Sequence, residues 1–108
     1  MGDSTVDKIS DVAELNEMSE FLQDENVDRA ISLLIRVLFE KGRIPSQQVK
    51  PILVELQGLS ALFALKATYF ATIGRSGSIE SQKKNIYMTL KEHIGKLVDA
   101  LKYIARVE

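Results

Sequence analysis

The sequence contains no cysteine and a single histidine, and these shortages exclude several kinds of functional site. Without cysteine there is no disulfide, no thiolate nucleophile and no zinc site built on sulfur. His93 has no second histidine with which to hold a transition metal, and carboxylates are scarce in the basic part of the chain. We therefore expect no cofactor and no metal, and we interpret His93 as a partly buried structural residue.

Proline and glycine are also scarce, with two and six residues in a chain of 108. So few helix-breaking residues, together with 45% apolar and 27% charged residues, are typical of one folded domain rather than of a disordered segment. The N-terminal residues are acidic, where a secretory signal would be basic and then continuously apolar. We therefore expect the protein to reside in the cytoplasm.

Apolar residues recur at helical spacing along almost the whole chain, which predicts an all-α fold. The expected helices cover about residues 6–22, 27–41, 47–73 and 79–106. Between the second and third helices, Gly42 is expected to take the left-handed conformation, and Ser46 is expected to cap the third helix. The last two helices would each be about 40 Å long. We predict a bundle of three to four helices built on a long antiparallel helical hairpin, against which the shorter helices pack.

The longest mainly apolar stretch, residues 56–74, approaches the length of a membrane-spanning helix. Lys66 lies near its middle, where a charge costs about 2.5 to 3.5 kcal/mol on insertion scales. We therefore predict a buried, central helix here and consider membrane insertion the less favoured alternative.

Charge is divided unevenly along the chain. Residues 1–28 hold nine acidic residues and one lysine, a net charge of −8, while residues 29–108 hold thirteen basic and six acidic residues, a net charge of +7. This predicts an acidic amphipathic arm or first helix over residues 1–28 and a basic helical core domain over residues 29–108. The arm could fold back onto the basic part, dock in a partner's groove or remain disordered. Its candidate partner-binding residues are Asp7, Asp11, Glu14 and Glu17.

The segment IGRSGSIESQKK, residues 73–84, could be either a phosphate-binding loop or a helix corner. A P-loop needs four residues between its glycines, whereas Gly74 and Gly77 are separated by two, and no strand is predicted before them. The corner explains each residue, since Gly74 can end one helix and Ser78 can cap the next. We predict a corner, with Arg75 and Lys84 marking a basic end of the hairpin.

The segments ATYFATIG and KKNIYMTLKEHIGKLVDALKYIAR, residues 67–74 and 83–106, resemble the C-terminal hairpin of small all-helical accessory proteins encoded by tailed bacteriophages. The resemblance covers less than half of the chain and includes no diagnostic motif. It implies a helical hairpin and no particular activity.

The pattern favours a non-catalytic protein-interaction or assembly module, because the helices have more apolar surface than one small chain can bury by itself. No catalytic residues are expected, since the serines lie mainly at predicted caps and turns and the acidic residues cluster on the first helix. Self-association, or binding of another protein, would use a strip of small residues on the third helix or the apolar seam of the fourth. These candidates are Gly58, Ala61, Ala64, Thr68, Ala71, Leu90, Ile94, Leu97, Leu101 and Ile104.

Two alternatives stay open at this point. A small nucleic-acid-binding protein would use the basic edge of the last helix, where several lysines project within ~20 degrees of one another. Its candidate residues are Arg75, Lys84, Lys91, Lys102, Arg106 and Tyr103, with Tyr103 stacking on a base. An inhibitor would instead present its acidic helix to a basic partner protein.

Overall fold

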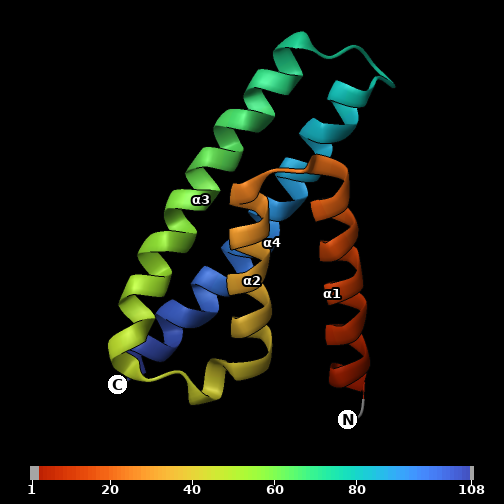
Figure 1. Ribbon diagram of the computed structural model, residues 1–108. Coiled ribbons are helices and arrows are strands. Elements are labelled where there is room, and N and C mark those ends of the chain that lie inside the picture. The colour runs from red at the N-terminus through yellow and green to blue at the C-terminus, as the bar shows by residue number, and fades with distance from the viewer. Residues whose placement is uncertain (1–2, 108) are drawn as a thin grey trace. The chain divides into compact units, whose positions relative to one another are not determined.

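The computed structural model describes residues 3–107, which form four α-helices and one short 3-10 helix, with no strand in this range (Figure 1). The elements are α1 (Asp3–Leu22), α2 (Glu25–Glu40), η1 (Lys41–Arg43), α3 (Ser46–Ile73) and α4 (Ile79–Val107). Side chains are described from Ser10 to Tyr103 apart from Lys41. The predicted all-α class is confirmed, and every predicted helix end lies within one turn of the observed one.

The chain divides into two compact units, Met1–Ile44 and Pro45–Glu108. The first contains α1, α2 and η1, and the second contains α3 and α4. The sequence predicted a division after residue 28, at the change in net charge. The structure places it after Ile44 instead, because α2 packs with α1 and belongs to the first unit despite its different charge.

In the first unit, a tight turn joins α1 to α2. Gln23 takes a left-handed conformation with a φ of 49°. The backbone N–H of Asn26 donates to Oδ1 of Asp24 over 2.9 Å, which caps the start of α2. The Ser19 hydroxyl on α1 donates to the carboxylate of Asp28 on α2. The buried apolar residues of the two helices are Leu15, Met18, Leu22, Val27, Ala30, Ile31, Leu34 and Val37.

Two predictions about the segment between α2 and α3 are wrong. Gly42 lies within η1, and the positive φ values of the described residues are confined to Gln23 and Gly77, so Gly42 is not a left-handed cap. Ser46 does not cap α3, because the helix already includes it and Pro45 is the N-cap residue. The Pro45 carbonyl accepts a hydrogen bond from the backbone N–H of Gln48 over 2.8 Å, which begins the helix one residue earlier than predicted.

The second unit is an antiparallel hairpin of α3 and α4, which pack together more extensively than any other pair of helices (Figure 1). The apolar seam of α4 is part of the core, since Leu90, Ile94 and Leu101 are fully buried. The buried residues of the hairpin are Val49, Ile52, Leu56, Leu59, Phe63, Ala67, Tyr87, Leu90, Ile94, Val98 and Leu101.

An aromatic cluster joins the two helices of the hairpin. The Tyr87 ring on α4 lies 5.6 Å from the Phe63 ring and is stacked 5.9 Å from the Phe70 ring, centroid to centroid. The Nζ of Lys66 lies 5.7 Å from the centroid of Tyr87, and the Nζ of Lys83 lies 5.6 Å from that of Phe70. The charge in the middle of the apolar stretch therefore lies against an aromatic face of the neighbouring helix.

The prediction that α3 is a buried, central helix holds for one side of it and is wrong for the other. Val54, Leu65 and Tyr69 are 68%, 70% and 58% exposed. The physical reason is that α4 covers only one stripe of α3 within the hairpin. Among the described residues, α3 is the one helix long and apolar enough to cross a membrane, and 28% of its most apolar window is buried. Core helices of soluble proteins can be equally long and apolar, so these two properties are weak evidence for a membrane span.

Candidate functional site

The segment that joins α3 to α4 is a helix corner, as predicted. The N–H of Gly74 donates to the carbonyl of Phe70 over 2.8 Å and closes the last turn of α3. The Ser78 hydroxyl accepts a hydrogen bond from the N–H of Ser81 over 3.2 Å, which caps α4. The same hydroxyl donates to the carbonyl of Arg75 over 2.6 Å and accepts from its N–H over 3.1 Å. All of these hydrogen bonds of the Ser78 hydroxyl are with backbone groups of the corner and the first turn of α4.

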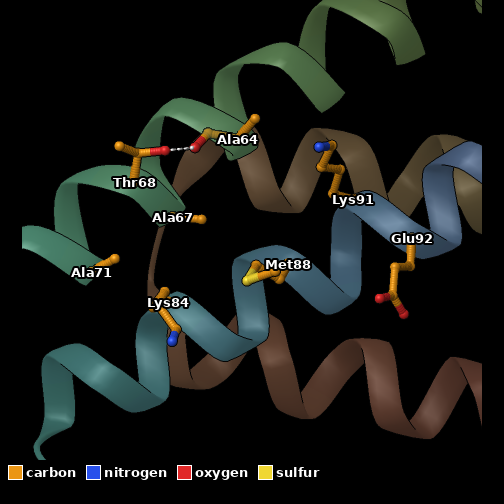
Figure 2. A pocket seen from close by; sticks show the side chains of 8 residues that line it. All are labelled: Ala64, Ala67, Thr68, Ala71, Lys84, Met88, Lys91 and Glu92. Carbon is orange, nitrogen blue, oxygen red and sulfur yellow. Dashed lines mark hydrogen bonds between the residues drawn. The ribbon is translucent and has the colours of Figure 1, made fainter. Parts of the chain in front are cut away.

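A groove of about 370 Å³ lies between α3 and α4, within the hairpin unit (Figure 2). One wall is made of small residues from α3 and the other of longer, mostly charged residues from α4. The lining residues are Ala64, Ala67, Thr68, Ala71, Lys84, Met88, Lys91 and Glu92. The groove thus brings part of the predicted small-residue strip opposite two of the predicted nucleic-acid-binding lysines.

The α4 wall of the groove carries positive charge that the described residues do not neutralise. Lys84 is half-buried and Lys91 is exposed, and no described carboxylate forms an ion pair with either. The side chain of Met88 lies between them along the helix and is 49% exposed (Figure 2). Glu92, which also lines the groove, forms no ion pair with a described side chain.

A second, smaller pocket of about 240 Å³ lies at the corner and shares Ala71 and Lys84 with the groove. Its other lining residues are Phe70, Gly74, Arg75, Ser76 and Ser81. Arg75 and Lys84 therefore do meet at one end of the hairpin, as the sequence predicted. The positive charge of the α4 wall continues from the groove to the corner.

A separate feature of α3 is an exposed face without charge, which we name the outer face. It consists of Val54, Gly58, Ala61, Leu65, Tyr69 and Thr72, all exposed and spaced three or four residues apart. The Thr72 hydroxyl donates to the carbonyl of Thr68 over 2.9 Å, and that of Thr68 donates to the carbonyl of Ala64 over 3.0 Å. These hydroxyls are thus satisfied within the helix, so the outer face offers mainly apolar atoms and small gaps.

The predicted interface candidates fall into two groups. Gly58, Ala61, Thr68 and Ala71 are exposed and Ala64 is half-buried, so the small-residue strip is accessible. The α4 candidates are not accessible in the same way, because Leu90, Ile94 and Leu101 are fully buried and Leu97 is half-buried. The side chain of Ile104 lies outside the described residues. The seam of α4 is therefore core, and its prediction as a free interface is corrected.

The predicted nucleic-acid candidates do not gather at one place. Lys102 lies eleven residues beyond Lys91 on α4, a distance of about 16 Å along a helix. Tyr103 is 70% exposed but points away from the lysine edge by about 100 degrees on a helical wheel. The side chain of Arg106 lies outside the described residues.

The predicted acidic arm is helical in the described range. Glu14 and Glu17 are exposed, Asp11 is half-buried, and the side chain of Asp7 lies outside the described residues. The apolar stripe of α1 is buried at Leu15, Met18 and Leu22, so it is not available for docking in a partner's groove. The acidic side of α1 is accessible.

His93 is half-buried, as expected, and the described residues contain no group of three histidine, aspartate or glutamate side chains that could hold a metal. Met88 was not predicted as part of any site. Its signal was present in the sequence, because Lys84, Met88 and Lys91 follow one another at the spacing of a helix face.

No protein-family model, curated protein or solved structure matches the chain. The resemblance to bacteriophage accessory proteins therefore stays a prediction from the sequence.

Proposed function

We propose that the chain is a non-catalytic assembly module that associates with a second copy of itself through the outer face of α3. The observation behind this proposal is the exposure of Val54, Leu65 and Tyr69 on a helix face that carries no charge. An apolar helix face of this length costs free energy in water, and covering it is favourable by roughly 25 cal/mol for each Å² of apolar surface. We expect the protein to work in the cytoplasm.

The outer face is suited to pairing with an identical face. Gly58 and Ala61 form a shallow gap, with Val54 before it and Leu65 after it. In a twofold interface the same residues contact one another in both directions, so Leu65 of each copy can fill the gap of the other. Because the face is uncharged, two copies meet without like-charge repulsion. One helix face is small for a protein interface, so we expect weak, concentration-dependent association.

Replacing Leu65 with glutamate tests this proposal. The full chain is expected to form a dimer whose fraction rises with concentration, measured by light scattering on a sizing column. Leu65→Glu should weaken the association by about 30-fold or more, because losing a central interface residue costs about 2 kcal/mol or more. The matched control is Gln82→Glu, which adds the same charge at an exposed position of α4.

Two results would contradict the proposal. One is a full chain that elutes with the mass of a monomer at every concentration. The other is a dimer whose stability is the same with and without Leu65→Glu while far-UV circular dichroism shows both proteins folded.

The two alternative functions have less support. The nucleic-acid candidates are spread along α4, and no exposed aromatic residue lines the groove that contains Lys84 and Lys91. For an acidic inhibitor, the accessible side of α1 presents Glu14 and Glu17, but its apolar stripe is already covered.

A further inference from the structure

The groove between α3 and α4 has a pattern that the outer face lacks. Its α3 wall presents Ala64, Thr68 and Ala71, and its α4 wall presents Lys84, Met88 and Lys91. Both sets of three lie at positions i, i+4 and i+7, so each wall repeats with the period of an α-helix over about 10 Å. A third α-helix lying along the groove has the same period, so its side chains can contact both walls.

From this pattern we propose that the groove binds an acidic amphipathic helix of a partner protein, which lies along the hairpin as a third helix. Small residues on the α3 wall let the partner backbone approach closely, as in tight helix packing. The exposed thioether of Met88 offers a flexible apolar contact to the centre of the bound helix. Glutamates seven residues apart on the partner, with a leucine between them, would meet Lys91, Met88 and Lys84 in turn.

The charge of the groove favours an acidic helix over an uncharged helix or a second copy of this chain. No described carboxylate pairs with Lys84 or Lys91, so an uncharged helix would cover their ammonium groups without compensating them. The outer face of a second copy is uncharged and is therefore a poor occupant of the groove. Nucleic acid brings phosphates for the lysines but no aliphatic side chain to pack on the alanines of the α3 wall. An acidic amphipathic helix can pair with the lysines of the α4 wall and pack its apolar side chains on the α3 wall.

Binding is tested with the full chain and a labelled, alanine-based helical peptide that carries two glutamates seven residues apart and a leucine between them. Fluorescence anisotropy at low salt should show saturable binding. A peptide with glutamine in place of both glutamates should bind at least about tenfold more weakly, since close charge pairs at interfaces are worth ~1.5 kcal/mol or more. Equal affinity for the two peptides would overturn the proposal.

Variants of the groove locate the binding. Lys91→Glu should reduce the affinity for the acidic peptide by more than tenfold, while Lys96→Glu, an equal charge change at an exposed position outside the groove, should reduce it by no more than about threefold. Met88→Ala should also weaken binding, and far-UV circular dichroism should show each variant folded. Equal losses from Lys91→Glu and Lys96→Glu would mean that the peptide senses only net charge and would overturn the proposal.

The same assay identifies other occupants. Displacement of the peptide by a short single-stranded DNA at lower concentration than by unlabelled peptide would assign the groove to nucleic acid. A higher peptide affinity in Glu14→Gln/Glu17→Gln would assign it to the acidic residues of the chain itself. A loss of dimer mass in Lys91→Glu would assign it to a second copy. Each of these results would overturn the proposal, whereas peptide binding that persists in Leu65→Glu separates this groove from self-association through the outer face.

Discussion

Replacing Phe63 with alanine is expected to lower the free energy of unfolding by about 3 to 5 kcal/mol. Phe63 is fully buried, and its ring lies 5.6 Å from that of Tyr87 on the other helix of the hairpin. The substitution removes apolar contact, leaves a cavity and ends one ring contact of the aromatic cluster that joins α3 to α4. Since single domains are stable by only about 5 to 15 kcal/mol, this loss is a large share of the total.

Urea unfolding followed by far-UV circular dichroism measures this effect, and the chain offers a close control. Leu65, two residues away on the same helix, is 70% exposed. Leu65→Ala should change the free energy of unfolding of the monomer by only about 0.5 kcal/mol, as is usual at exposed positions. Similar losses for Phe63→Ala and Leu65→Ala would show that α3 does not have one buried and one exposed side.

Replacing Gly74 with alanine is expected to cost about 1 to 3 kcal/mol, as overpacking usually does. A Cβ at this position would lie 2.7 Å from the carbonyl oxygen of Phe70 and 3.0 Å from the backbone nitrogen of Ser81. Both atoms belong to the backbone, so the corner would have to shift to make room. The φ of Gly74 is −85°, so the requirement for glycine here comes from space and not from a left-handed conformation.

Gly95, within α4, is the control for this substitution. A Cβ there would meet no atom within 4 Å, and alanine favours a helix over glycine by about 1 kcal/mol. Gly95→Ala should therefore raise the thermal midpoint, while Gly74→Ala should lower it, in the same calorimetric measurement. A midpoint that rises in both variants would show that the corner is not tightly packed at Gly74.

Most of the fold could be predicted from the sequence because its signals are local. The break at Gly74 and Ser78 separates two long apolar patterns, and a short connection between long helices leaves the antiparallel hairpin as the natural arrangement. The errors were local too. Ser46 and Gly42 have the residue types of caps, but Pro45 and η1 provide the backbone geometry at this place.

The candidate site could be predicted only in part because it depends on which residues lie opposite one another. Ala64 and Lys91 were predicted as members of two different surfaces, and only the packing of α3 on α4 makes them walls of one groove. The burial of the α4 seam could not be predicted from the sequence for a similar reason. An apolar seam such as Leu90, Ile94 and Leu101 has the same pattern whether it covers the chain's own core or binds a partner.

Self-association through the outer face is tested most directly by cross-linking at a single position. Because the chain has no cysteine, Ala61→Cys introduces one thiol at the centre of the outer face, and Gln82→Cys introduces one at an exposed position of α4. Under mild oxidation in dilute solution, Ala61→Cys should form a disulfide-linked dimer much faster than Gln82→Cys, and Leu65→Glu in the same chain should abolish this difference. Equal rates of dimer formation in the two single-cysteine variants would contradict the proposal that two copies meet at the outer face of α3.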